Sequence, residues 1–321
     1  LFHLVASKGE YPARLSGRFR HEASLRTDLP SVGDWVVAEI PEKSEQAVIH
    51  GLLPRRSNFS RKVSGRRVEE QIVASNVDVV FLVTGLDGDF NVRRIERYLV
   101  LAHSSGAAPV IVLTKSDLHA DCGSFVAEVE AVAAGVPVLR VSNLTGEGFP
   151  ALEKQLVPKR TIALLGSSGT GKSSIINRLL GCEKQAVLPV REDDSRGRHS
   201  TTHRELFALP NGALIIDSPG MRELQLWGSE GLEDTFPDIQ VLAENCRFRD
   251  CNHGEEPGCA VHQAVEERRR PEDRFEGYLK LKKEQAYVER RTDLKAMQEH
   301  KRHMKDIARR CKEIKRIKKK Y

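Results

Sequence analysis

The chain has 321 residues, with 51 Lys and Arg against 45 Asp and Glu, and 40% of its residues are hydrophobic. This content is enough for two or three packed domains, and because the sequence holds no run of 18 apolar residues, it predicts no membrane-spanning helix. No signal-peptide pattern opens the sequence, so we expect a cytoplasmic protein.

Residues 1–68 are predicted to form a small β-barrel. A turn at Gly33 and Asp34 leads into an apolar strand at 35–40, and shorter apolar segments follow at 47–49 and 51–54. Several short strands in so short a region favour an OB-fold, although another small barrel fits the pattern too. A basic linker is predicted after the barrel, carrying Arg55, Arg56, Arg61, Lys62, Arg66 and Arg67.

Residues 69–229 alternate between strand-like and helical patterns. Helical segments such as 93–104 and 125–134 separate several of the apolar runs. Buried strands spaced by helices predict an α/β domain whose parallel sheet is covered on both faces. The six expected strands are 77–83, 110–113, 136–141, 162–165, 205–209 and 214–216.

The first chemical motif along the chain is Thr114-Lys115-Ser116-Asp117, at the end of the second of these strands. It resembles the [NT]KxD motif with which GTPases read guanine: the Asp carboxylate accepts from guanine N1 and N2, which adenine cannot offer, and the Lys stem covers the base. Thr114 stands where Asn is commoner, so we expect a weaker contact between this loop and the phosphate-binding loop. Ser142 follows the next strand, where backbone contacts to guanine O6 are expected, although a plain turn explains that segment as well.

The second motif fits the pattern G-x-x-x-x-G-K-S of a P-loop, set between a predicted strand and a predicted helix. Its backbone N–H groups are expected to surround the β-phosphate at a helix N-terminus. Lys172 should bridge the β- and γ-phosphates, and Ser173 should ligate Mg²⁺. The expected phosphate-binding residues are Gly166, Ser167, Ser168, Gly169, Thr170, Gly171, Lys172, Ser173 and Ser174.

The order of these two motifs is the reverse of the usual one. In an ordinary GTPase the P-loop precedes the guanine motif, whereas here the guanine motif comes first. This order is the mark of a circularly permuted GTPase, whose chain starts at what is normally the fourth strand of the sheet.

Switch residues are expected after the P-loop helix. Asp217 and Gly220 fit a DxxG motif, with Asp217 reaching Mg²⁺ through water and Gly220 contacting the γ-phosphate. Met221 follows where many GTPases carry a water-orienting Gln, and a thioether cannot take that role. We therefore expect His199 to orient the attacking water, the alternative being a solvent-exposed histidine, and Thr201 (alternatively Thr202) to contact Mg²⁺ and the γ-phosphate.

A cluster of potential metal ligands follows: Cys246, Cys251, His253 and Cys259. Three thiols and an imidazole in one short segment suit a closed tetrahedral Zn²⁺ site that contributes folding energy. A redox or structural-thiol role is the alternative. The crowding favours metal over disulfides and agrees with a reducing compartment.

Excess positive charge gathers at the C-terminal end. Residues 262–321 carry 21 Lys and Arg against 11 Asp and Glu, whereas the rest of the chain carries 30 against 34. This charge favours a polyanion, most plausibly nucleic acid, although a solvated helical face has the same composition. Residues 301–321 are nearly all polar, which predicts either a helix that needs a partner or a partly unstructured tail.

Taken together, these residues resemble the ribosome small-subunit-dependent GTPase A family, also called RsgA or YjeQ. The GRHSTT segment is similar to the family's G-x-H-T-T-T loop with Ser200 in place of a Thr, and CRFRDCNH followed by PGCAV is similar to its zinc segment. The resemblance implies an OB-fold barrel at 1–68, a permuted GTPase domain at 69–229 and a zinc-binding domain with a basic helical extension at 230–321. It further implies a monomer that binds the rRNA of the small ribosomal subunit late in assembly, with slow GTP hydrolysis that the subunit stimulates.

The residues leave two other functions open. A non-hydrolysing adaptor that binds RNA and senses GTP or GDP is favoured only by Met221. An ATP-dependent P-loop kinase is disfavoured by Asp117 and by the DxxG motif.

Overall fold

The computed structural model describes residues 2–7, 9–40, 46–63, 69–182, 205–217, 224, 231–254, 256–267 and 271–292. The chain divides into two compact units, the first made of Leu1–Gly65 with Glu69–Gln225 and the second of Arg66–Val68 with Leu226–Tyr321. The finer domain boundaries expected at 68/69 and 229/230 stay predictions.

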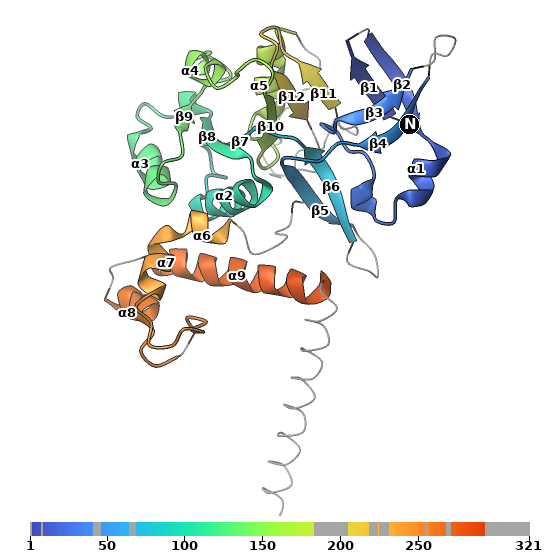
Figure 1. Cartoon of the computed structure of the whole chain (residues 1–321). Helices are drawn as coiled ribbons and strands as arrows, with labels where there is room; N and C mark the ends of the chain where they lie inside the picture. Colours follow the sequence, from blue (N-terminus) through green and yellow to red (C-terminus); the bar gives the residue numbers. More distant parts are fainter. Residues whose placement is uncertain are drawn as a thin grey trace, which may run out of the picture. The chain divides into compact units, whose positions relative to one another are not determined.

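A curled four-stranded sheet opens the first unit (Figure 1). Its strand order is β1-β2-β4-β3, in which β2 and β4 run parallel and the other pairs are antiparallel. Fully buried Ala13, Ala47 and Ile49 form the centre of its small core. The elements of this part are β1 (Phe2–Ala6), β2 (Gly9–Leu15), α1 (Gly17–Glu22), the 3₁₀ turn η1 (Arg26–Asp28), β3 (Val36–Glu39) and β4 (Ala47–Leu52).

The expected basic linker after this sheet is wrong in two respects. Residues 58–63 and 69–75 form an antiparallel hairpin of β5 (Asn58–Val63) and β6 (Glu69–Ser75), because Phe59, Ile72 and Ala74 provide the buried side chains that a strand pair needs. Arg55 is a structural residue, since its guanidinium binds both carboxylate oxygens of Asp34 at 2.8 and 2.7 Å and donates to Leu29 O.

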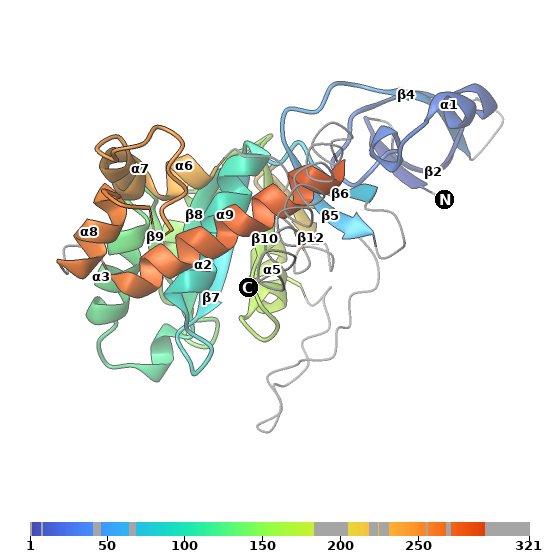
Figure 2. The ribbon, with the colours of Figure 1, turned by 90° about the horizontal axis from the view of Figure 1, so that it is seen from below.

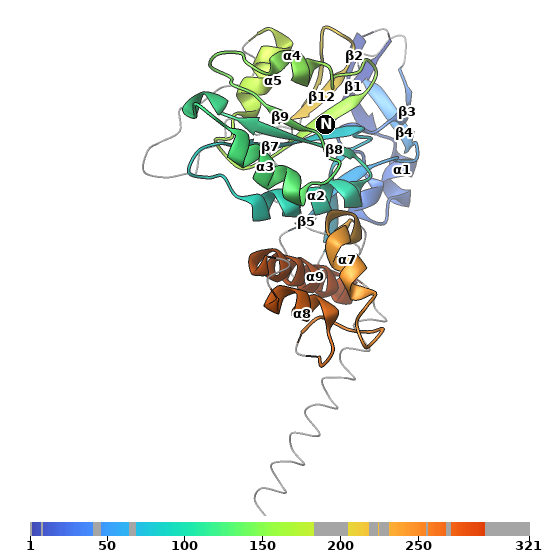
Figure 3. The same ribbon diagram turned by 90° about the vertical axis from the view of Figure 1, so that its left-hand side faces the viewer.

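The six predicted strands of the central region form one sheet of order β11-β12-β10-β7-β8-β9. Figures 1 and 3 show α2 and α3 on one face of this sheet and α4 and α5 on the other. Its elements are β7 (Val79–Gly85), α2 (Val92–Ser105), β8 (Ala108–Thr114), the 3₁₀ turn η2 (Ser116–Leu118), α3 (Gly123–Val132), β9 (Val138–Arg140), α4 (Phe149–Glu153), β10 (Thr161–Leu165), α5 (Lys172–Leu180), β11 (Glu205–Ala208) and β12 (Leu214–Asp217).

Successive side chains of the central strands point to opposite faces of the sheet, so both faces carry buried side chains. Phe81 and Ile162 pack in the core beneath α4 and α5, with Phe149 of α4 and Ile175 of α5. Leu82 is equally buried and, by the two-residue period of a strand, faces α2. The prediction of an α/β domain covered on both faces is confirmed.

One strand departs from the expected parallel sheet. β11 pairs with β12 in antiparallel register, Glu205 opposite Asp217 and Ala208 opposite Leu214. Leu209 N donates to Ala213 O at 2.8 Å and closes a tight turn between the two strands. A connection this short cannot cross over the sheet, so the pair has to be antiparallel.

The regular secondary structure of the second unit is helical in the described residues. Figures 1 and 2 show α7 and α8 gathered at one end of the long α9. Arg274 of α9 anchors α7 through paired hydrogen bonds to Asp238 at 2.7 and 3.1 Å, while its guanidinium lies 4.8 Å from the ring centre of the buried Phe236. The helices are α6 (Leu232–Thr235), α7 (Pro237–Ala243), α8 (Ala260–Glu266) and α9 (Glu272–Thr292).

Within the described ranges, no helix combines the length and the apolar composition that a bilayer crossing requires.

Candidate nucleotide site and metal centre

The P-loop lies between β10 and α5, at the carboxyl edge of the sheet. Gly166 has no room for a side chain, because a Cβ there would lie 2.2 Å from Val83 O on β7. Gly171 has a φ of 86°, and its Cβ would lie 2.6 Å from Asn143 Nδ2. The contact with Val83 O explains why the loop needs glycine at 166, and the left-handed φ explains it at 171.

Lys172, Ser173 and Ser174 occupy the first turn of α5, as the motif predicts. The Lys172 ammonium donates to Gly166 O at 2.8 Å and also to Ser167 O. Its charge is therefore held over the mouth of the loop, at the N-terminus of a helix, where an anion is favoured.

The guanine motif ends β8 and is joined directly to the P-loop. Thr114 donates from its hydroxyl to Thr170 O at 2.7 Å, and both groups are buried. The close approach of β8 to the P-loop brings the Thr hydroxyl within full hydrogen-bond distance, and the expectation that this contact is weaker than that of an Asn stays a prediction. Lys115 follows with a left-handed φ of 60°, which turns the chain into η2.

Ser142 and Asp117 meet where β8 and β9 end side by side. The buried Ser142 hydroxyl donates to Asp117 Oδ1 at 2.5 Å, and Ser116 N donates to Val141 O at 3.3 Å. The serine thus fixes the orientation of the carboxylate that is expected to read guanine. Sequence reasoning assigned Ser142 only a backbone role and missed this side-chain contact.

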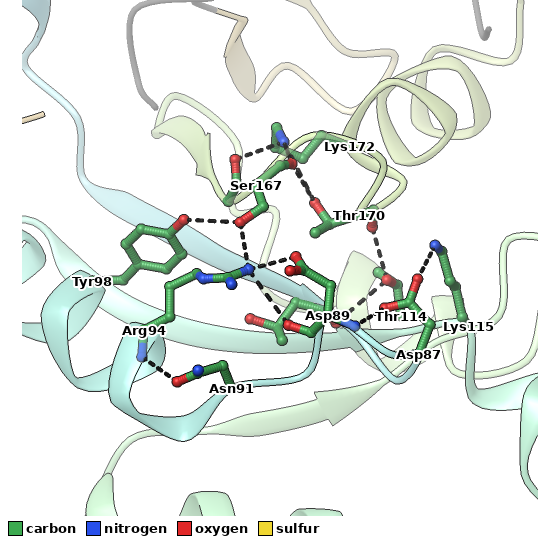
Figure 4. Close-up of polar contacts among 12 residues, drawn as sticks. Asp87, Asp89, Asn91, Arg94, Tyr98, Thr114, Lys115, Ser167, Thr170 and Lys172 are labelled. Atoms are coloured by element: carbon green, nitrogen blue, oxygen red, sulfur yellow. Dashed lines mark hydrogen bonds and ion pairs between the residues drawn. The ribbon is translucent and has the colours of Figure 1, made fainter. Parts of the chain in front are cut away.

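The loop that follows β7, residues 86–91, contributes charged contacts that sequence reasoning also missed (Figure 4). Asp87 forms an ion pair with Lys115 of the guanine motif. Burial alone would raise the pKa of Asp87, but the hydrogen bond from Lys115 and nearby backbone groups outweigh it, so the pKa lies below its ordinary value. The residue therefore stays ionised and holds the lysine beside the pocket.

Arg94 links the same loop to the P-loop. Its Nη1 donates to Ser167 Oγ at 2.7 Å and forms an ion pair with Asp89, as Figure 4 shows. The hydrogen bond to Asp89 raises the pKa of Arg94 above its ordinary value. A useful sequence signal existed: acidic residues directly after a buried parallel strand lie at the ligand-binding edge of the sheet.

Of the predicted switch residues, only Asp217 is described. It is the last residue of β12, and β12 runs parallel to β10, so it lies at the same edge as the P-loop. His199, Thr201, Thr202, Gly220 and Met221 lie outside the described residues.

The four predicted metal ligands meet in one cluster before α8. Their ligand atoms all lie within 4.8 Å of one another. Cys246 Sγ is 3.9 Å from Cys259 Sγ, and His253 Nδ1 is 3.7 and 3.6 Å from these two sulfurs. Tetrahedral Zn²⁺ with bonds of about 2.3 Å to sulfur and about 2.05 Å to nitrogen needs separations of about 3.8 and 3.6 Å. The donor set and its spacing therefore fit zinc.

The direction of the pKa shift differs among the predicted metal ligands. Burial raises the pKa of Cys259 to about 11. Burial lowers the pKa of His253, and the positive charge of Lys282 lowers it further. Burial also acts to raise the pKa of Cys246, but the backbone amides of Ala260 and Val261 reverse the direction, so it lies below its ordinary value. A bound cation would compensate the buried thiolates and keep the imidazole neutral.

Comparison with known proteins gives one consistent result. The family model described as "RsgA GTPase" matches residues 52–227. The small ribosomal subunit biogenesis GTPase RsgA of Opitutus terrae is 50% identical over 300 residues, which are 90% of this chain and 82% of the relative. RsgA 1 of Oceanobacillus iheyensis is 45% identical over 307 residues, 95% of this chain and 88% of the relative.

Solved structures agree with the sequence relatives. The crystal structure of YjeQ from Thermotoga maritima has a TM-score of 0.62 at 28% identity, covering 86% of this chain and 90% of that one. YloQ, described as a circularly permuted GTPase, has a TM-score of 0.60 at 25% identity, covering 87% of this chain and 88% of that one.

Proposed function

The chain belongs to the RsgA family of circularly permuted GTPases, and we propose that it hydrolyses GTP during late maturation of the small ribosomal subunit, whose rRNA it binds. The observation that carries the nucleotide chemistry is the convergence of the P-loop and the guanine motif, joined by the Thr114 hydrogen bond to Thr170 O. The adaptor alternative is not favoured, because the relatives are named as GTPases.

Each residue of the nucleotide site receives a proposed role. The P-loop amides and Lys172 hold the phosphates, Asp117 reads guanine, and Arg94 and Asp87 keep the two loops in place. Ser173 and Thr201 would hold Mg²⁺, with Asp217 acting through water, and the ion supplies charge neutralisation when bound. Gly220 would contact the γ-phosphate, and His199 would orient water for attack.

The domain boundaries, the oligomeric state, the location and the role of the tail are also proposals. We propose an OB-fold barrel at 1–68, a GTPase domain at 69–229 and a zinc-binding domain at 230–321, in a cytoplasmic monomer. The basic C-terminal tail, which lies outside the described residues, would supply part of the RNA contact.

Because of the circular permutation, the zinc-binding segment follows the switch segment directly along the chain, so a change of bound nucleotide can act on it. The chain leaves the sheet at Asp217, and the C-terminal segment of the second unit starts at Leu226. Between them, the buried Leu224 forms an isolated β-bridge with Arg61 on the β5–β6 hairpin. A change at Gly220 on hydrolysis would therefore act on a short connection that is anchored just before the unit boundary.

The proposed function is tested by measuring GTP turnover while purified small subunits are titrated in. We expect slow intrinsic hydrolysis, a saturable stimulation by small subunits and none by large subunits. Lys172→Ala should abolish both activities, which assigns them to this site. Equal turnover with either subunit, or with none, would contradict the proposal.

Guanine specificity should depend on Asp117. Asp117→Asn removes the acceptor for guanine N1 and N2 and offers an amide that complements xanthine, so we expect GTP affinity to fall by about 10²-fold or more and xanthosine triphosphate to become the better ligand. Competition binding with both nucleotides and ATP measures this change. Glu130→Gln, an exposed carboxylate on α3, is the matched control. Unchanged GTP affinity in Asp117→Asn would remove the residue from the base pocket.

A further inference from the structure

A polar cavity lies at the edge of the six-stranded sheet opposite to the candidate nucleotide site. Its volume is about 380 Å³. Asp78 directly precedes β7 and Arg160 directly precedes β10, so the cavity lies at the amino ends of the strands whose carboxyl ends carry the P-loop and its neighbours. A five-residue strand spans on the order of 16 Å, which separates the two sites. The lining residues are Arg56, Ser57, Asn76, Val77, Asp78, Gly106, Pro158, Lys159 and Arg160.

Positive charge dominates this cavity, which we call the amino-edge pocket. Arg56, Lys159 and Arg160 are exposed, and none of them has an ion-pair partner in the described part of the chain. The single carboxylate in the lining, that of Asp78, accepts from Thr161 N at 2.8 Å. The lining therefore combines three cationic residues with one acid that already has a backbone donor, so a bound anion would balance the charge.

The backbone that presents these groups is unusual. Four non-glycine residues in the described ranges have a positive φ: Asn76, Lys115, Lys159 and His253. Lys115 belongs to the guanine motif and His253 to the metal cluster, while Asn76 and Lys159 both line the amino-edge pocket. A left-handed backbone is disfavoured in a residue with a side chain, less so in Asn than in Lys, and such conformations concentrate at functional sites.

Hydrogen bonds hold both strained residues in place. Asn76 N donates to Ser57 O and its Nδ2 to Gly33 O, each at 2.9 Å, and its Oδ1 accepts from Arg56 N at 3.0 Å. Lys159 N donates to Gly212 O at 2.9 Å. The pocket is thus a fixed arrangement built from four separate segments of the chain.

The lining selects among ligand classes. No aromatic side chain is present to stack on a base, a single carboxylate cannot hold a divalent cation, and exposed cations exclude an apolar ligand. A phosphate group matches both the charge and the donors. We propose that the amino-edge pocket binds a backbone phosphate of small-subunit rRNA; this rests on the proposed function and extends it to a contact surface away from the GTP site.

The test compares single variants of the full-length protein in binding to purified small subunits over a series of salt concentrations. Lys159→Ala or Arg160→Ala should weaken binding by about five- to tenfold and reduce the salt slope by about one phosphate contact. Lys154→Ala is the matched control, because it removes an equal charge from an exposed side chain nearby that does not line the pocket. GDP affinity should stay unchanged in all three, which verifies the fold of the nucleotide site.

The outcomes separate this inference from the proposed function. If the unmodified protein binds small subunits and both pocket variants behave like Lys154→Ala, the pocket assignment is overturned while the proposed function stands. If the unmodified protein does not bind small subunits, the proposed function fails first. Titration with inorganic phosphate distinguishes a site for a free phosphate ion from a site for an RNA phosphate. Pocket variants that lose phosphate binding but keep full subunit binding would contradict the RNA assignment.

Discussion

Removing zinc should unfold the loop around residues 246–259 and leave GTP binding within a few-fold of its original affinity. The ligand cluster supplies the contacts that hold this loop, since Cys246 and Cys259 bring its two ends within 3.9 Å at their sulfurs. Structural zinc contributes on the order of 10 kcal/mol to folding, more than so short a loop gains from other contacts. Hydrogen exchange before and after chelation measures the local loss.

The first turn of α8 should lose protection together with the loop. His262 N donates to Cys259 Sγ at 3.4 Å, so a sulfur that would bind the metal also caps this helix. The contact between Phe236 and Tyr278, whose ring centroids are 5.4 Å apart, includes no metal ligand and should keep α9 protected, although the Tyr278 ring also lies 6.2 Å from that of His253. This difference would separate local unfolding from collapse of the whole second unit.

Substitution gives the matched comparison. Cys251→Ser should reproduce the effect of chelation, whereas Cys182→Ser, at an exposed thiol outside the cluster, should behave like the unmodified protein. Metal analysis should find about one zinc per chain, and none in Cys251→Ser. Purified protein with its thiols reduced, no metal and a fully protected loop would refute the zinc assignment.

Motifs that encode a local backbone shape could be predicted from the sequence. The spacing of Gly166, Gly171 and Lys172 specifies a loop between a strand and a helix, and the structure has it there. The four metal ligands lie on one short segment, so their spacing alone indicated the cluster. The six strands of the large sheet were predictable because each contains an apolar run, although only β7 and β10 are buried along their whole length and β9 and β11 are partly exposed.

Contacts between distant segments could not be predicted in the same way. Arg94 and Ser167 are 73 positions apart, and nothing local at either residue indicates the other. The β5–β6 hairpin was missed because Arg61 and Lys62 interrupt its apolar pattern and its stability comes from pairing with a partner strand. The direction of β11 depended on the tight turn at 209–213, which the strand pattern itself does not contain.

Replacing His199 with alanine should lower subunit-stimulated GTP turnover by about 10²-fold or more while GTP affinity stays within a few-fold. The reason is chemical: Met221 follows the DxxG segment and its thioether cannot orient water, so another group has to place the nucleophile in line with the γ-phosphate. His199 lies two positions before Thr201, in the segment expected to close over that phosphate. An imidazole can both accept from and donate to water near neutral pH.

Three measurements make this prediction specific to catalysis. His203→Ala, which removes a second histidine from the same segment, should retain stimulated turnover and so controls for a general loss of loop structure. The pH profile of stimulated turnover should change in His199→Ala and stay unchanged in His203→Ala. Intrinsic turnover should fall less than stimulated turnover, because the subunit is expected to order the loop that places the imidazole. Full stimulated turnover in His199→Ala, with GTP and subunit binding intact, would assign water orientation to another group, and a ribosomal group would then be the first candidate.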